Sequence, residues 1–135
     1  MTTSTLPEEP DSCIYRRVFR GHPDQIGEVR QFLRTHLAGH PSATDVVLVA
    51  SELTTNACEH PHTGRSGGTF TVEARQRPDS TIRLEVHDNG GPTAFGETSM
   101  HKEGGRGLSI VTALTTAWGV NGDAAGRTVW AEFKP

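Results

Sequence analysis

The chain has 135 residues, a net charge of −3 and a sequence pI of about 6.1. Its length fits one domain, and a hydrophobic content of 33% is enough for a core without metal or disulfide support. A slightly acidic balance without long runs of like charge excludes a nucleic-acid or membrane-surface partner that is held by charge. The sequence has two cysteines outside any C-x-x-C spacing, which predicts a reducing compartment. It shows no apolar leader and no long apolar stretch, so we expect a cytoplasmic protein with no membrane partner.

The N-terminal part of the sequence predicts a tail, a strand and a helix. Residues 1–12 are polar and rich in proline, as expected of a flexible tail that precedes a domain over 13–135. Side chains alternate over 13–20, which predicts a strand. Apolar residues then recur at helical spacing from Pro23, and Gly39 is expected to end this first helix.

A second and longer helix is predicted from Ser42 to about His60. Ser42 followed by Asp45 resembles a capping box, and Pro61 is expected to stop the helix. An apolar stripe along this helix predicts its buried face. The stripe comprises Val46, Val49, Ala50, Leu53 and Ala57.

The remaining sequence predicts four strands and one further helix. The expected elements are strands around 70–74 and 82–86, a helix over 106–117, and strands near 118–121 and 127–133. The residues at 78–80 favour a turn between the first two strands, whereas the long polar stretch at 90–105 shows no partner strand. Because the strands form hairpins and the helices are grouped apart from them, the sequence predicts an α+β fold, a two-layer α/β sandwich.

The second predicted helix carries a carboxylate and an amide on one face. Glu52 and Asn56 are four residues apart and offset from the apolar stripe, so we expect them side by side, outside the core but at its edge. A carboxylate accepts a proton, and an amide oxygen is a hard ligand suited to Mg²⁺. Taken alone, the same pattern is more typical of a solvated helix face.

Another carboxylate follows the strand predicted around 82–86. Asp88 has the same parity as the apolar, inward-facing residues of that strand, so it is also expected to point inward. An inward carboxylate needs a hydrogen-bond donor, which the exocyclic amine of a bound base would supply. The competing interpretation is an Asn-Gly hairpin turn at 89–90, but no alternating apolar strand follows it.

A glycine-rich segment opens the helix predicted over 106–117. Gly105 and Gly107 let the backbone approach an anion, and the helix N-terminus directs N–H groups at it. Arg106 adds positive charge to the same segment. The spacing of the glycines matches neither a Walker loop nor a Rossmann fingerprint.

In chain order, these motifs read E-x-x-x-N on a helix, D-x-G after a strand and G-x-G at the start of a helix. In this order the sequence resembles the ATP-binding (Bergerat) domain shared by histidine kinases, DNA gyrase, mismatch-repair ATPases and the ninety-kilodalton heat-shock chaperones. The resemblance covers about 13–133 and is strongest to the small anti-sigma-factor serine kinases. The segments that carry it are Ser51-Glu52-Leu53-Thr54-Thr55-Asn56-Ala57, Val86-His87-Asp88-Asn89-Gly90, Gly105-Arg106-Gly107-Leu108 and Gly126-Arg127-Thr128-Val129-Trp130-Ala131. It implies a mixed, mostly antiparallel sheet that is covered by helices on one face.

The resemblance also implies a role for each motif residue. Glu52 would be the general base that activates a seryl hydroxyl or water, and Asn56 would ligate Mg²⁺ at the phosphates of ATP. Asp88 would accept a hydrogen bond from the adenine amino group, and residues 91–104 would form a lid over ATP. Gly90 would permit close approach of the base, and Thr128 would lie on the adenine side. The remaining implied nucleotide-binding residues form one segment, whose glycines would wrap the phosphates: Gly105, Arg106, Gly107 and Leu108.

The implied activity is that of an ATP-dependent serine-protein kinase. Such a kinase binds a sigma factor, phosphorylates a small anti-anti-sigma (STAS-type) protein and so switches partners; the resemblance also admits a homodimer. Two other classes remain open: a nucleotide-binding regulatory module without kinase activity, and a protein-interaction domain that binds no nucleotide. A zinc site at Cys58, His60 and His62 is a further alternative, although no second cluster completes a tetrahedral set.

Overall fold

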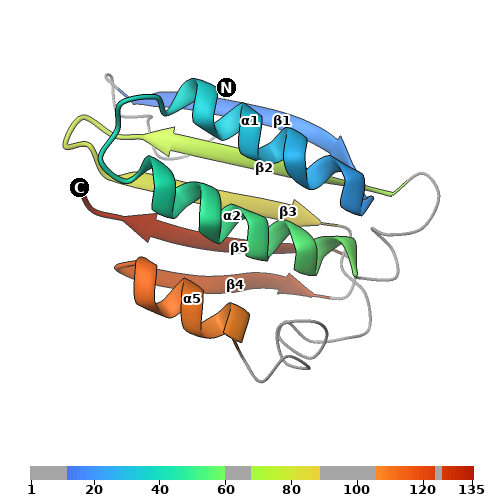
Figure 1. Cartoon of the computed structure of the whole chain (residues 1–135). Coiled ribbons are helices and arrows are strands. Elements are labelled where there is room, and N and C mark those ends of the chain that lie inside the picture. The colour runs from blue at the N-terminus through green and yellow to red at the C-terminus, as the bar shows by residue number, and fades with distance from the viewer. Residues whose placement is uncertain (1–11, 60–67, 89–105, 124–125) are drawn as a thin grey trace, which may run out of the picture.

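The computed structural model describes residues 12–59, 68–88, 106–123 and 126–135. Its elements, in the order shown in Figure 1, are β1 (Cys13–Arg20), η1 (Pro23–Gln25), α1 (Ile26–His36), α2 (Ala43–Cys58), β2 (Thr69–Gln76), β3 (Ile82–Asp88), α5 (Arg106–Leu114), β4 (Ala117–Asp123) and β5 (Gly126–Phe133). The predicted tail over 1–11 and the polar stretch at 90–105 lie outside the described residues. Within the described ranges, no helix is long and apolar enough to cross a membrane.

Five strands form one sheet in the order β1-β2-β3-β5-β4. All four neighbouring pairs are antiparallel, so the sheet is antiparallel throughout rather than mostly so. The chain passes from β3 through α5 to the edge strand β4, and β5 then returns between them. Strands β3 and β4 run in the same direction (Figure 1), but β5 separates them, so no parallel pair forms.

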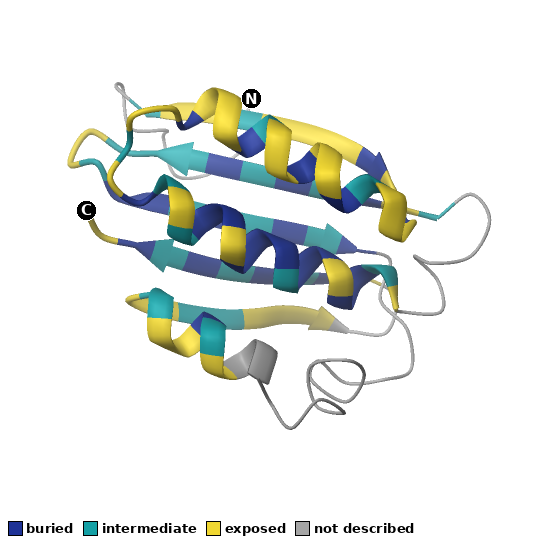
Figure 2. Cartoon of the chain, viewed as in Figure 1, coloured by how far each residue is buried: buried dark blue, intermediate teal, exposed yellow. Residues whose placement is uncertain are grey.

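The α-helices of the described residues, α1, α2 and α5, cover one face of this sheet, and the core lies between the two layers (Figures 1 and 2). Alternate residues of each central strand face the helices and are buried, which confirms the predicted α+β sandwich. The whole apolar stripe predicted for α2 is buried against the sheet. The largest fully buried side chains are Phe19, Phe70, Phe133, Leu33, Leu37, Leu53, Ile82 and Leu84.

The last helix is shorter than its sequence pattern predicts. It ends at Leu114 and the chain enters β4 at Ala117, whereas the apolar spacing predicted a helix to residue 117. The reason is a contact with the sheet: Thr116 donates from its backbone N–H, at 2.8 Å, and from its hydroxyl, at 3.0 Å, to the Glu132 carbonyl. These bonds join the chain to β5 and end the helix.

The predicted capping box at the start of α2 is wrong. Ser42 precedes the helix, but its hydroxyl makes no capping bond and instead donates to the Lys134 carbonyl at 3.3 Å. Its backbone N–H donates to His40 Nδ1 at 2.9 Å, and His40 Nε2 lies 2.8 Å from the Ser80 carbonyl. The start of α2 is therefore held by the β2–β3 turn and the C-terminus, which are remote in sequence.

Candidate functional site

The carboxylate and amide of the first motif lie on one flank of α2. This helix lies between α1 and α5 over the sheet (Figure 1) and contacts both. Arg30 Nε of α1 donates to the Ser51 hydroxyl at 2.9 Å, so the Ser51 side of α2 faces α1. Glu52 and Asn56 are rotated from Ser51 by about 100° and about 140° around the helix, which places them on the flank towards α5.

Asn56 is more deeply buried than its sequence position suggests. Its exposed fraction is 1%, whereas Glu52 keeps intermediate exposure. The expectation that both residues lie outside the core is therefore wrong for Asn56, because α5 packs against this flank of α2. The pair combines a partly exposed carboxylate and an amide that is shielded from solvent.

Hydroxyl side chains bond to the backbone of α2 on both sides of this pair. Ser51, Thr54 and Thr55 each donate to the backbone carbonyl four residues earlier, at 2.9, 2.7 and 2.7 Å. These bonds satisfy the polar groups of a helix segment that is otherwise poor in helix formers. The sequence Ser51–Asn56 thus forms a regular helix that holds the carboxylate and the amide on one flank.

Asp88, the last residue of β3, points to the helix side as predicted. It is 8% exposed and has the parity of the buried apolar residues of β3. Its register partners are Phe70 on β2 and Arg127 on β5. Helix α2 and strand β3 both end, and β5 begins, at the same end of the sheet (Figure 1), so Asp88 lies at the end where the Glu52–Asn56 segment of α2 also lies.

Arg127 is a buried residue of this region to which the sequence motifs assigned no role. It is 7% exposed and lies directly opposite Asp88 in the β3–β5 pair. The signal was present in the sequence, since Arg127 has the parity of the apolar residues Val129 and Ala131 and must share their inward direction. Directly opposed residues of an antiparallel pair have Cβ atoms about 4.5–5.5 Å apart, so the two residues are close neighbours.

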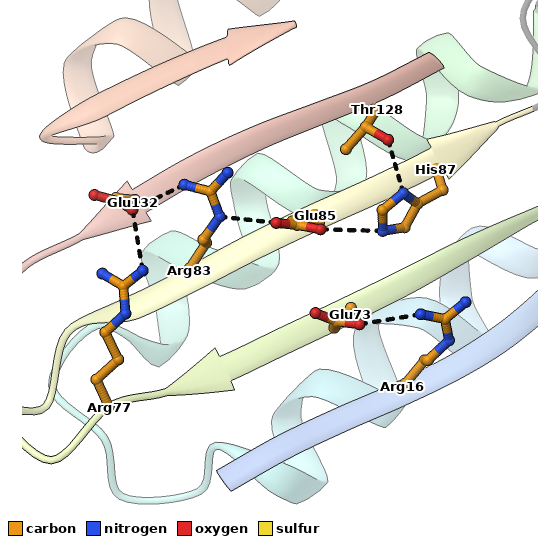
Figure 3. A network of polar contacts seen from close by, with 8 residues as sticks. All are labelled: Arg16, Glu73, Arg77, Arg83, Glu85, His87, Thr128 and Glu132. Atoms are coloured by element: carbon orange, nitrogen blue, oxygen red, sulfur yellow. Dashed lines mark hydrogen bonds and ion pairs between the residues drawn. The ribbon is translucent and has the colours of Figure 1, made fainter. Parts of the chain in front are cut away.

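Thr128, expected on the adenine side, lies on the other face of the sheet. Its hydroxyl is 2.7 Å from Nδ1 of His87, and both residues alternate with the inward-facing Asp88 and Arg127. Figure 3 shows Thr128 and His87 on the face that the helices leave open. The structure therefore brings Arg127, and not Thr128, to the side of Asp88.

A polar network extends from Thr128 along the open face (Figure 3). His87 Nε2 lies 3.1 Å from Glu85, whose carboxylate also accepts from Arg83 Nε at 2.8 Å. Arg83 in turn donates to Glu132 at 2.9 Å. The contact with His87 and the hydrogen bond from Arg83 lower the pKa of Glu85 to about 2, although burial acts in the opposite direction. These interactions pair β3 with β5 and leave Glu85 ionised at neutral pH.

The remaining predicted site residues are only partly covered. Gly90 and Gly105 lie outside the described residues. The backbone of Arg106, Gly107 and Leu108 forms the first turn of α5, in agreement with the predicted helix start. Their positions show that the glycine-rich segment opens a helix, as an anion-binding turn requires.

The alternative zinc site is incomplete in the described part of the chain. Burial raises the pKa of the Cys58 thiol to about 11, so the metal-free thiol is protonated at neutral pH. His60 and His62 lie outside the described residues. Among the residues described, no group of three or more His, Cys, Asp and Glu side chains is placed to hold a metal ion.

A surface pocket lies between α1 and α2, on the flank of α2 opposite Glu52 and Asn56. Its lining residues are Arg34, Ala43, Thr44 and Val47. None of the described residues that line it carries a carboxylate or an amide side chain. It is therefore separate from the motif residues.

The antiparallel sheet, covered on one face by helices, defines an α+β sandwich with a buried amide and a buried carboxylate at one end. Residues 19–133 match the histidine kinase-like ATPase domain, and the chain belongs to this family. None of the curated proteins compared with the sequence matches it significantly.

Two solved structures share the fold. The crystal structure of the RsbU and RsbW domains of Rv1364c from Mycobacterium tuberculosis is 24% identical, with a TM-score of 0.65 over 88% of this chain and 32% of that chain. The histidine kinase domain of the blue-light activated histidine kinase EL346 from Erythrobacter litoralis is 18% identical, with a TM-score of 0.54 over 82% of this chain and 63% of that chain. The chain thus spans about a third of the first structure and less than two thirds of the second.

Proposed function

We propose that this protein is an ATP-binding anti-sigma factor and serine-protein kinase that phosphorylates an anti-anti-sigma partner of the STAS type. The observation that carries the proposal is the burial of Asn56 and Asp88 on the helix side of one end of the sheet, with the more open Glu52 beside Asn56. Membership of the histidine kinase-like ATPase family supports the nucleotide. The fold shared with a chain that contains RsbU and RsbW domains is consistent with the proposed regulatory role.

Each side chain has one task in the proposed reaction. Asp88 accepts a hydrogen bond from the adenine amine and so orients the base. Glu52 accepts the proton of the seryl hydroxyl while the serine oxygen bonds to the γ-phosphorus of ATP, and ADP leaves with the bridging oxygen. Gly90, Gly105 and Gly107 allow the backbone to approach the nucleotide closely.

The donor set on α2 fits a magnesium ion. Mg²⁺ prefers hard oxygen ligands and keeps several waters, and the Asn56 amide supplies such an oxygen next to the Glu52 carboxylate. Asn56 would hold the ion at the phosphates, where Mg²⁺ neutralises their negative charge. The burial of Asn56 keeps this ligand in a fixed position, which a solvated side chain would not provide.

The proposal is tested with Glu52→Gln, which keeps the shape of the side chain and removes the base. We expect ATP to bind with unchanged affinity in calorimetric titration, and transfer of labelled γ-phosphate to a serine of a STAS-type protein to fall by 10²-fold or more, on the order of a lost general base. Asp45→Asn is the matched control, because Asp45 lies on the same flank of α2 two turns earlier.

Three other outcomes lead to different conclusions. If the wild type binds ATP but labels no STAS-type protein, the chain is a nucleotide-binding regulatory module without kinase activity. If Glu52→Gln abolishes ATP binding, Glu52 has a structural role and the assignment of the base is wrong. If the wild type does not bind ATP in the presence of Mg²⁺, the proposed function itself fails.

A further inference from the structure

Two opposite charges are buried together at the end of the sheet. Asp88 and Arg127 are the two ionisable residues classed as buried in the described ranges, with exposed fractions of 8% and 7%. They are register partners in the β3–β5 pair and share the helix side of the sheet. The Arg127 guanidinium has no task in the reaction proposed above.

Fold stability does not explain why a charged pair occupies this position. A buried ion pair contributes little net stability compared with apolar residues of similar volume, because both charges lose their hydration. The next inward pair of the same two strands is Val86 opposite Val129, which shows that apolar residues fit this face. The charges are therefore better explained by a polar ligand that binds beside them.

The geometry of a guanidinium allows it to serve Asp88 and a ligand at once. Arginine has five N–H donors in a rigid fork, and a carboxylate has about four lone-pair sites. In the same row across the sheet, the outer neighbours of the pair are Phe70 and Gly122, which bring no charged side chain to either side. A ligand at Asp88 thus meets an acceptor and, from a neighbouring residue whose Cβ lies about 5 Å away along the row, a side chain of donors.

We propose that Arg127 is a second base-reading residue, whose guanidinium donates a hydrogen bond to the ring nitrogen beside the amine that Asp88 binds. This inference rests on the proposed binding of adenine at Asp88. In adenine, the exocyclic amine is a donor that lies between two ring acceptors, N1 and N7. The pair Asp88 and Arg127 offers the complementary acceptor and donor, so it would recognise the edge of the base rather than the phosphates.

The test combines changes in the ligand with changes in the protein. ATP, 1-deaza-ATP and 7-deaza-ATP are titrated calorimetrically into the wild type, Arg127→Met and Arg83→Met; each analogue replaces one ring acceptor by C–H. We expect the wild type to bind one of the two analogues about 10- to 100-fold more weakly than ATP, as for a lost hydrogen bond to a charged group. Arg127→Met should bind ATP more weakly by a similar factor and should no longer distinguish that analogue from ATP.

Arg83→Met is the matched control, because Arg83 lies on the open face of the same sheet. It should retain the full preference for ATP. If the wild type binds ATP and both analogues equally, or if Arg127→Met keeps the preference, the inference is wrong while the ATP site stands. If the wild type binds none of the three, the proposed function fails and the inference with it. If Arg127→Met does not fold, Arg127→Lys replaces it, because lysine keeps the positive charge but lacks the rigid fork of N–H donors. The wild-type analogue series and Arg127→Lys then decide whether Arg127 reads the base.

Discussion

Glu85 provides a quantitative test of the network on the open face, because its carboxylate lies between His87 and Arg83. The contact with His87 and the hydrogen bond from Arg83 lower the pKa of Glu85 from 4.5 to about 2, against the raising effect of burial. A folded-state pKa below the unfolded value contributes stability that is fully present above about pH 4.5 and is lost as the pH falls towards 2. This shift corresponds to about 3 kcal/mol at full weight. Since the side chain is 22% exposed, solvent screens it and we expect about 1–2 kcal/mol.

The perturbation is Glu85→Gln, and the assay is urea denaturation at about pH 6 and about pH 3. The substitution should lower the free energy of unfolding by about 1–2 kcal/mol at the higher pH and by less than half of that at the lower pH. Glu28→Gln, on the exposed side of α1, is the control for a general change in charge. An equal cost of Glu85→Gln at both pH values would refute the reasoning, as would an NMR titration that places the pKa of Glu85 near 4.5.

Three further predictions concern the core, the open face and the metal ligand. Leu53→Ala should lower the free energy of unfolding, measured by urea denaturation, by about 2–5 kcal/mol, because Leu53 is 1% exposed. Its control is Leu48→Ala on the solvent side of the same helix, where the side chain is 43% exposed and the loss should be about 0.5 kcal/mol or less. Gly119→Ala would bring a Cβ to within 2.8 Å of the Trp130 indole. We therefore expect the fold to lose about 1–3 kcal/mol of stability and the tryptophan fluorescence to shift. An unchanged spectrum and an unchanged stability would contradict the close approach. Asn56→Ala should remove the gain in ATP affinity that Mg²⁺ provides, which titrations with and without Mg²⁺ measure, and a gain of wild-type size would exclude Asn56 as the ligand.

Most of the elements could be predicted from the sequence, because alternation and helical spacing are local signals. The boundaries that were wrong depend on contacts with remote residues. Helix α5 ends early because Thr116 binds the Glu132 carbonyl, and Ser42 does not cap α2 because its hydroxyl binds the Lys134 carbonyl. These partners lie 16 and 92 residues further along the chain, beyond the few residues over which helical spacing or strand alternation is read.

The candidate site was predicted in part. The shared flank of Glu52 and Asn56 follows from helical periodicity, and the inward direction of Asp88 follows from strand parity. The depth of Asn56 could not be predicted, because it depends on α5 packing against α2. The expected position of Thr128 beside the adenine came from resemblance, whereas the parity of β5 turns that residue to the open face.

By itself, the sequence determined the alternation of strands, the apolar face of α2 and the order of the three motifs. These properties depend on residues that are close in the chain, and the physical signal is burial of one side of each element. Only the tertiary structure decided that β5, rather than β4, lies beside β3, and this choice places Arg127 directly opposite Asp88. Strand order is set by which surfaces bury the most apolar area together, a property of the whole sheet and its helices that no single segment contains.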